Sequence, residues 1–335
     1  MGKIALVDEY GAFLSAKDGR FQLLVRDEDG RRIVKWDLAP VEVDSIVFVI
    51  KGASISASAI ELASKFGVDL VFLDKNRPVA RLLPATYGST MRTWLHQLKA
   101  YEDEETRAEI AKLFVEGKIY NQKRVLAWYA KRTRAAGKPL RVVEKIVDKI
   151  DAYLMKLNNV KTAEEAAIIE AHVARLYWHG VAEVLPDEIG FRGRITRSSA
   201  KEGPVDPFNR ALNIGYAALK KEVWRAVFLA GLNPYLGFLH KPRAGKMALV
   251  FDLMEEFRPV CVDRPLIRLA RAKPQIFRLF KLGRDQEAVI EIWRTVVNFM
   301  RKARKPYITI IVKQARSLAM HLRGTGRYKP YKVKW

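Results

Sequence analysis

The spacing of apolar residues changes at about residue 84, and this change limits the possible folds more than any other feature. Before it, short segments rich in β-branched and aromatic residues, such as "FQLLVR" and "SIVFVI", alternate with Asp-Gly turns. After it, apolar residues recur three and four positions apart over long stretches, which is the period of an amphipathic helix. We therefore expect an α+β protein: a small N-terminal, mostly antiparallel β domain over residues 1–84, followed by a larger all-helical C-terminal domain over residues 85–335.

The N-terminal domain contains one predicted helix, in "SASAIELASKFG". Ser58 with Glu61 three residues later reads as a capping box, Ser56 is the alternative cap, and Gly67 ends the helix.

Eight helical segments are predicted in the C-terminal domain, and one of them contains two prolines. The eight cover residues 92–102, 106–134, 142–157, 163–184, 211–230, 248–270, 285–304 and 307–322. The segment from residue 248 should kink or break at Pro259 and Pro265, because proline lacks the N–H that a helix interior needs. The C-terminal tail "GTGRYKPYKVKW" could lie along a phosphate backbone, but fraying is the default expectation for a terminus.

The excess of positive over negative charge lies entirely in the C-terminal domain. The chain holds 60 Lys and Arg against 37 Asp and Glu, a net charge of +23, whereas residues 1–84 hold 12 of each. A basic surface restricted to one part of the chain indicates that this part binds a polyanion, and nucleic acid is the favoured one. No apolar run is long enough to cross a bilayer, and the single Cys261 cannot form an internal disulfide. We expect a cytoplasmic protein with no membrane partner.

An acidic cluster in "MALVFDLMEEFRP" is unusual in so basic a chain. In a helix, Asp252, Glu255 and Glu256 stand at i, i+3 and i+4 and share one face. Such acids are common on solvated faces, but here the flanking apolar residues favour burial. Half-buried carboxylates need compensating cations, and a divalent metal is the usual one.

Two further residues are candidates for the same site. His240 precedes the turn "KPRAG", which is long enough to fold its imidazole over the acids; a histidine of the core is the alternative. Glu170 follows the Ala/Ile-rich run "AAII", where a helix should be apolar, and Tyr177 lies in line with it at i+7.

Four segments in order along the chain carry a family resemblance: "IIEAHVARLYW", "DPFNRALNIGYAALK", "GLNPYLGFLH" and "MALVFDLMEEFRPVCVD". Together they resemble the CRISPR-associated integrase family, the first-numbered of the Cas proteins. The N-terminal "GASISASAIELASKFGVDLVFLD" is similar to the β-domain helix and strand of that family, so the resemblance covers nearly the whole chain.

The resemblance implies a set of roles for these residues. It implies that Glu170, His240 and Glu255 are the catalytic metal ligands and hold Mg²⁺ or Mn²⁺. Asp252, one turn before Glu255, would be an outer or alternate acid. Asn209 and Tyr216 would support the site, and Arg258 and Asp263 continue the last motif.

The turn after His240 supplies candidate phosphate ligands. Lys241, Arg243 and Lys246 are placed to hold DNA phosphates near the metal, although an ordinary solvated loop is an equal alternative. Arg175 and Arg258 are also expected to bind DNA. Tyr177 would orient the nucleophile or stack on a base, with core packing as its alternative.

The activity that the resemblance implies is the joining of spacer DNA 3′-hydroxyl ends to a CRISPR repeat array by transesterification. Hydrolysis of DNA, including branched DNA, would accompany it. The implied partners are the spacer duplex, the CRISPR repeat, a second copy of the chain that forms a homodimer through the N-terminal domains, and the small second Cas protein, which bridges two dimers in a prokaryotic host. A free-standing structure-selective nuclease and a non-enzymatic nucleic-acid-binding protein are the alternatives.

Overall fold

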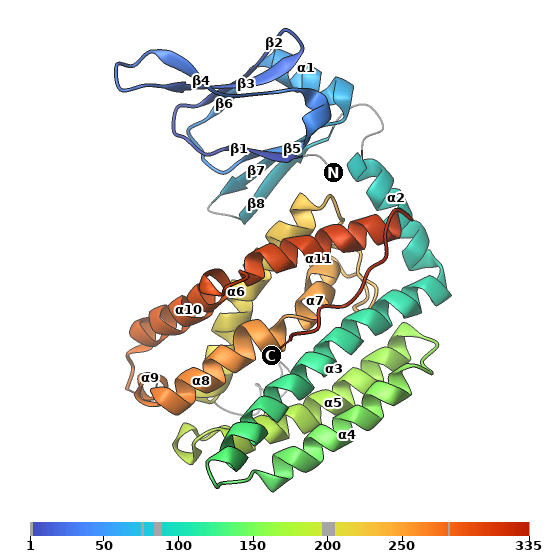
Figure 1. Cartoon of the computed structure of the whole chain (residues 1–335), viewed down its shortest axis with the longest axis vertical. Helices are drawn as coiled ribbons and strands as arrows, with labels where there is room; N and C mark the ends of the chain where they lie inside the picture. The colour runs from blue at the N-terminus through green and yellow to red at the C-terminus, as the bar shows by residue number, and fades with distance from the viewer. Residues whose placement is uncertain (1–2, 75–76, 84–88, 196–204, 281, 335) are drawn as a thin grey trace. The chain divides into compact units, whose positions relative to one another are not determined.

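The computed structural model describes every residue except 1–2, 75–76, 84–88, 196–204, 281 and 335. The chain divides into two compact units: Met1–Gln97 with Trp224–Asn233 forms unit 1, and Leu98–Val223 with Pro234–Trp335 forms unit 2. The predicted α+β class is confirmed, because a strand-rich N-terminal region precedes a mostly helical remainder (Figure 1). The predicted domain boundary, between residues 84 and 85, lies outside the described residues.

Unit 1 contains two four-stranded sheets, with strand orders β1-β5-β7-β8 and β4-β3-β2-β6. The strands are β1 (Lys3–Val7), β2 (Phe13–Lys17), β3 (Arg20–Arg26), β4 (Arg32–Leu38), β5 (Val43–Phe48), β6 (Ser54–Ile55), β7 (Asp69–Asp74) and β8 (Arg77–Leu82). Three pairings among these strands are antiparallel and three are parallel, so the sheets are mixed rather than mostly antiparallel as predicted. The Asp-Gly turns predict the hairpins, whereas parallel pairs join strands far apart in sequence and leave no local signal.

Local signals in unit 1 set its turns and its first helix. Asp18 and Gly19, between β2 and β3, have φ of 51° and 71°, the left-handed conformation that a tight hairpin turn requires. Helix α1 (Ala57–Phe66) begins at Ser56, whose hydroxyl accepts a hydrogen bond from the backbone N–H of Ala59, and ends at Gly67 with φ of 68°. Ser56, the alternative cap in the sequence prediction, is therefore the N-cap of α1, and the predicted capping box of Ser58 with Glu61 is wrong.

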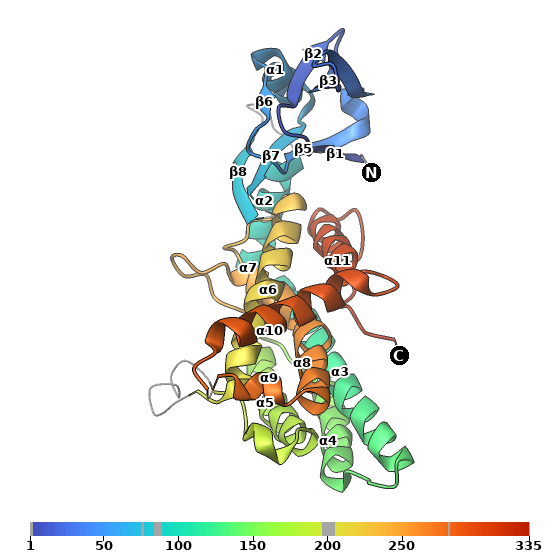
Figure 2. The same ribbon diagram turned by 90° about the vertical axis from the view of Figure 1, so that its left-hand side faces the viewer.

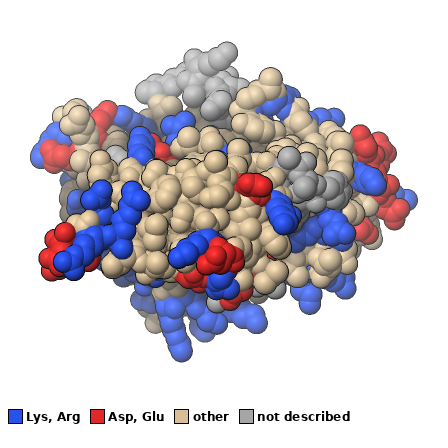
Figure 3. Space-filling model, turned by 90° about the horizontal axis from the view of Figure 1, so that it is seen from above, with Lys and Arg blue, Asp and Glu red and all other residues tan. Residues whose placement is uncertain are grey.

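The core of unit 1 lies between the sheets and α1, as the views in Figures 1 and 2 show, and includes Leu14, Phe21 and Ile46. The end of α6 joins this unit because the buried guanidinium of Arg81 donates to the backbone carbonyl of Phe228. Figure 3 shows both acidic and basic side chains on one face of the molecule.

Helices make up most of unit 2, and α3, α4 and α5 pack side by side (Figures 1 and 2). The helices that follow α1 are α2 (Ser89–Glu102), α3 (Glu104–Ala135), α4 (Arg141–Leu157), α5 (Ala163–Val184), α6 (Pro207–Leu229), α7 (Ala248–Glu255), α8 (Arg264–Ala272), α9 (Gln275–Arg278), α10 (Asp285–Lys302) and α11 (Tyr307–Leu322). Among the described residues, no helix has the length and apolar character needed to span a membrane.

The predicted break in the segment from residue 248 is confirmed. Helix α7 ends at Glu255, and a π-helical segment over Arg258–Asp263 precedes α8. Pro259 is the second residue of this segment, and Pro265 lies in the first turn of α8, where a missing N–H costs little.

The C-terminal tail is packed, so the expectation of fraying is wrong. The Tyr328 and Val333 side chains are 1% and 2% exposed. The amide of Asn121 on α3 donates to the carbonyl of Tyr331 and accepts from the N–H of Val333, at 2.8 Å and 2.9 Å. Buried backbone groups of the tail thus find partners on α3, and this tertiary pairing overrides the usual behaviour of a terminus.

Candidate functional site

Two of the predicted acids converge on one ammonium group in unit 2. Glu170 from α5 and Glu255 from the end of α7 both pair with Lys118 of α3, whose Nζ lies 2.5 Å from Glu255 Oε2. Arg258 approaches from the other side, with its Nε 3.0 Å from Glu255 Oε1. Sequence reasoning missed Lys118, although a lysine within the apolar stretch "LFVEGKIY" of a long helix is a signal that could have identified it.

The cations keep this cluster charged. Burial by itself raises the pKa of Glu255, but Arg258 and Lys118 outweigh burial and lower that pKa to about 2. Burial lowers the pKa of Lys118, but Glu255 and Glu170 outweigh it and the net shift is upward. At neutral pH Glu255 is therefore an anion and Lys118 is a cation.

Asp252 fixes the loop that carries His240. The backbone N–H groups of Phe238, Leu239 and His240 donate to its carboxylate, and His240 Nδ1 lies 2.6 Å from Asp252 Oδ1. In a neutral imidazole, a ring nitrogen that donates to a carboxylate leaves the other nitrogen as the acceptor, so this contact favours Nε2 as the nitrogen for another partner. Gly237 permits this approach, because a Cβ there would lie 2.7 Å from Asp252 Oδ2.

The residues fit a divalent metal in type and charge. Two carboxylates already share one cation, and the buried Glu255 Oε2 has the Lys118 ammonium as its partner. Carboxylate oxygens with one imidazole nitrogen are suitable ligands for Mg²⁺ or Mn²⁺. As the described side chains stand, however, no three His, Cys, Asp or Glu residues are grouped closely enough to hold a metal, so His240 is not brought together with Glu170 and Glu255.

A cavity of about 220 Å³ surrounds the cluster, and a cleft of about 990 Å³ adjoins it. Arg194, Tyr216 and Arg258 line both, so the cleft leads to the carboxylates. His240, Lys246 and Lys220 line the cleft as well. No carboxylate is among the described residues that line the cleft, so its charge favours an anionic chain such as a phosphodiester backbone.

The predicted DNA-binding residues fall in different places. Lys246 lines the cleft, and Arg258 is buried against Glu255 with its guanidinium 4.7 Å from the Tyr216 ring. Lys241 pairs with Glu164 at 3.1 Å, while Arg243 and Arg175 are exposed and do not line the cleft.

The cleft also contains Arg194 and Lys220, which sequence reasoning did not select. Asn209 holds Arg194, because its side-chain oxygen accepts from Arg194 Nη1 at 2.7 Å. The structure therefore gives Asn209 a positioning contact at the cleft wall.

Tyr177 and Tyr216 both donate to Asp263, at 2.9 Å and 2.7 Å. Tyr177 is fully buried, which corresponds to its core-packing alternative, whereas Tyr216 also faces the cavity. Burial raises the pKa of Asp263 to about 6, against the opposing effect of the two hydroxyl groups. The three side chains lock α5, α6 and the π-helical segment together behind the carboxylates.

Two premises of the sequence argument were wrong. Glu256 does not join the other acids but binds the C-terminal tail through Tyr328 and the N–H of Tyr331. The run before Glu170 is not uniformly buried, because Ile168 is 57% exposed. In both cases helical spacing identified a face, but the packing of distant segments decided what covers it.

Known proteins of one family match this chain over nearly its whole length. A family model described as CRISPR associated protein Cas1 matches residues 5–280. The "CRISPR-associated endonuclease Cas1 1" of Saccharolobus solfataricus is 40% identical over 332 residues, covering 99% of this chain and 84% of the relative. The "CRISPR-associated endonuclease Cas1" of Korarchaeum cryptofilum is 33% identical over 283 residues, covering 81% of this chain and 79% of that one.

Solved structures show the same fold. A casposase bound to integration product superposes with a TM-score of 0.78 at 25% identity, covering 99% of this chain and all of that chain. A Cas1 protein from Thermotoga maritima gives a TM-score of 0.71 at 18% identity, covering 98% of each chain, and this likeness concerns the fold alone.

Proposed function

Because the chain belongs to the Cas1 family of CRISPR-associated proteins, we propose that it is a metal-dependent DNA endonuclease and integrase. In this proposal it joins the 3′-hydroxyl ends of spacer DNA to the CRISPR repeat array. The observation that carries the proposal is the convergence of Glu170 and Glu255 on one cation, at the end of a cleft lined by basic side chains. The casposase structure supports the joining reaction, since that relative in fold is bound to an integration product.

The reaction is a transesterification. A DNA 3′-hydroxyl attacks a phosphodiester, a new P–O bond forms, and the bond to another 3′-oxygen breaks, so the attacking group belongs to the DNA and no nucleophilic side chain is required. The same site with water in place of the hydroxyl would hydrolyse DNA, branched DNA included. Arg194, Lys220 and Lys246 would position the phosphates along the cleft.

Glu170, Glu255 and His240 would hold Mg²⁺ or Mn²⁺. When bound, the metal would stabilise the charge that develops at the scissile phosphate. Asp252 keeps the His240 ring oriented through Nδ1 and so leaves Nε2 as the nitrogen that can bind a metal. Arg258 and Lys118 lower the pKa of Glu255 and so hold it ionised, which is the state that binds a cation.

The proposal includes partners. We expect a homodimer formed through the N-terminal domain, whose charge is balanced, and the small second Cas protein as a bridge between two dimers. A chain of a partial Cas6-RT-Cas1–Cas2 complex shares the fold, with a TM-score of 0.67 and 18% identity. Cas2 is for this reason the partner to test.

The decisive test compares two neighbouring glutamates. Purified protein is incubated with Mn²⁺ or Mg²⁺, a short labelled duplex with free 3′-hydroxyls, and a supercoiled plasmid that carries a repeat array, with and without the second Cas protein. We expect Glu255→Gln to lower the rate of label transfer to the plasmid by about a hundredfold or more, because a metal ligand and its charge are lost. Glu170→Ala and His240→Ala should have comparable effects.

Glu256→Gln is the matched control, because it makes the same chemical change one residue away and should stay within a few-fold of wild type. Nicking of the plasmid without joining of the label would favour a free-standing nuclease. If the Glu255, Glu170 and His240 variants all joined label as well as wild type, the acids would be structural and the proposal would be wrong.

A further inference from the structure

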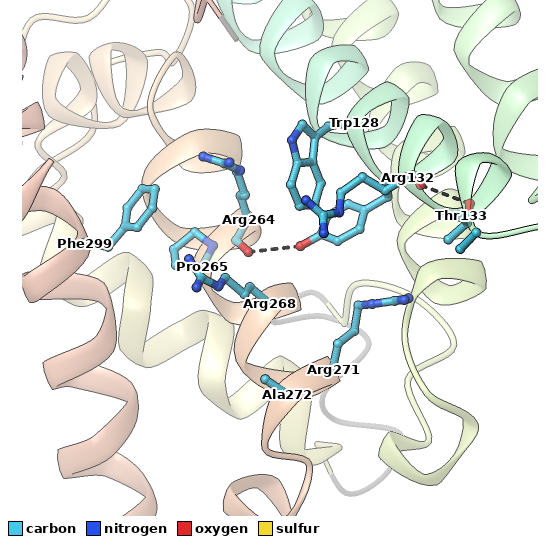
Figure 4. A pocket seen from close by; sticks show the side chains of 11 residues that line it. Trp128, Arg132, Thr133, Arg264, Pro265, Arg268, Arg271, Ala272 and Phe299 are labelled. Atoms are coloured by element: carbon cyan, nitrogen blue, oxygen red, sulfur yellow. Dashed lines mark hydrogen bonds between the residues drawn. The ribbon is translucent and has the colours of Figure 1, made fainter. Parts of the chain in front are cut away.

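A second cavity in unit 2 shares no lining residue with the carboxylate cavity or its cleft. It has a volume of about 560 Å³ and lies between α3, α8 and α10 (Figure 4). On α3 it begins at Trp128, ten positions after Lys118 and so about 15 Å further along the helix. Its lining residues are Trp128, Tyr129, Arg132, Thr133, Ala136, Arg264, Pro265, Arg268, Arg271, Ala272 and Phe299.

Four arginines and no carboxylate are among the described residues that line this cavity. Arg264, Arg268 and Arg271 stand on α8 at i, i+4 and i+7, which places them along one face of that helix. Arg132 reaches the same space from α3, as Figure 4 shows. Arg132, Arg268 and Arg271 are exposed, so an anion from solution can reach them.

Electrostatics in the cavity indicate that its positive charge is concentrated. All four guanidinium groups act on the phenol of Tyr129 and lower its pKa, although burial dominates and raises that pKa to about 12. The pKa of Arg264 is lowered, first by burial and also by the like charge of Arg268. Crowded cations of this kind are stabilised when an anion enters.

Aromatic rings hold the arginines in place. The Arg132 and Arg264 guanidinium carbons lie 4.9 Å and 5.2 Å from the centre of the Trp128 ring, and Arg264 is 5.9 Å from the Phe299 ring. Planar guanidinium groups ordered on rings are suited to bidentate binding of phosphate oxygens. Trp128 and Phe299 already carry these guanidinium groups, so the fixed order of the arginines, rather than an open ring face, favours phosphate over the carboxylates of an acidic peptide.

We propose that the cavity between α3, α8 and α10 binds nucleotide phosphates at a site separate from the metal centre. Its size falls within the range of small-ligand sites, and it can take one or two nucleotide units. Two sources share this chemistry: a free nucleotide, and a single strand of nucleic acid that runs past the catalytic cleft. Binding at this site requires neither a metal nor catalysis, so this proposal can be tested independently of the proposed function.

The experiment measures binding to the full-length protein in EDTA, so that the metal centre does not contribute. The probes are ATP, a short single-stranded oligonucleotide and inorganic phosphate, followed by tryptophan fluorescence and by calorimetry. The test variant is Arg132→Gln/Arg268→Gln, which removes two exposed arginines of the cavity. The control is Arg141→Gln/Arg304→Gln, which removes the same charge from exposed arginines that do not line the cavity.

We expect the cavity variant to weaken binding of ATP or the oligonucleotide by at least about tenfold, and the control to stay within about twofold. Tighter binding of ATP than of the oligonucleotide would identify a free nucleotide as the occupant, and the reverse order would identify a strand. Equal weakening by both double variants, unchanged binding by the cavity variant, or equal competition by polyglutamate would overturn the proposal.

Discussion

Glu255 and Glu256 are adjacent and both buried, yet their surroundings give them opposite chemistry. Glu255 faces Lys118 and Arg258, and these cations lower its pKa to about 2 despite burial. Glu256 faces neutral donors from the C-terminal tail and α11, and burial raises its pKa to about 7. The charge of the partners, not the depth of burial, thus decides which carboxylate is kept as an anion and which serves as a structural clamp.

The same contrast separates Asp263 from Glu170. Asp263 has two tyrosine hydroxyls as hydrogen-bond partners and a raised pKa, whereas Glu170 shares the Lys118 ammonium with Glu255. Glu170 and Glu255 are compensated by cations. Glu256 and Asp263 are bonded to neutral groups that tie neighbouring segments together, although Asp263 lines the same cavity as Glu170 and Glu255. The following experiments test whether this division holds.

The largest effect on stability is expected from Lys118→Met, measured by urea unfolding in EDTA. The variant leaves the buried Glu255 and the half-buried Glu170 near each other without their shared cation, although Glu255 keeps Arg258. Removing one partner of a buried ion pair costs up to about 3–5 kcal/mol. Added Mn²⁺ should restore stability more in the variant than in wild type, because the metal would replace the missing charge.

Lys332→Met is the control for this experiment. Its ammonium pairs with Glu116 at 2.6 Å in a partly exposed position, and such pairs contribute about 1 kcal/mol or less. Equal losses in the two variants would mean that the cluster around Glu255 is no different from a surface ion pair, and the comparison would fail.

A pH effect of about 3 kcal/mol is expected from Asp263. Its pKa is about 6 in the folded protein against an ordinary value of 3.8, so its contribution to stability is fully present below about pH 4 and is lost as pH rises through about 6. Between those values the unfolding free energy of wild type should fall more steeply than that of Asp263→Asn, which cannot titrate at this position. Parallel curves from chemical unfolding over this range would show that the neutral donors do not leave Asp263 with a raised pKa.

The acids of the candidate site could be selected from the sequence, but the groups that surround them could not. Helical spacing and the family motifs identified Glu170, His240, Asp252 and Glu255, because those residues lie in short patterns that can be read locally. Most of the helices were predicted to within a few residues, since each carries its own apolar period and its own ends. The short α9 was missed, and the predicted segment 248–270 is divided into α7, the π-helical segment and α8.

The partners of those acids were not predictable in the same way. Lys118 lies 52 positions before Glu170, and Tyr328 lies 72 positions after Glu256. The apolar neighbours of Lys118 indicate a buried lysine but not its partner, and a tyrosine in a basic tail has an ordinary solvated alternative. The parallel strand pairs of unit 1 were missed for the same reason: each contact is set by tertiary packing rather than by neighbours in the sequence.

The smallest effect expected is that of Tyr328→Phe, which removes the hydroxyl that donates to Glu256 and changes nothing else in the tail. Loss of one buried hydrogen bond to a carboxyl group should lower the unfolding free energy by about 1–2 kcal/mol. Tyr10→Phe is the control, because the Tyr10 side chain is 85% exposed and its hydroxyl can bond to water, so its change should stay within about 0.5 kcal/mol. If Tyr328→Phe matched Tyr10→Phe, the tail would not be clamped through Glu256, and the packing of Val333 and the bonds to Asn121 would have to hold it alone. If instead it cost as much as Lys118→Met, Glu256 would behave as a buried anion, and the contrast between the two adjacent glutamates would be lost.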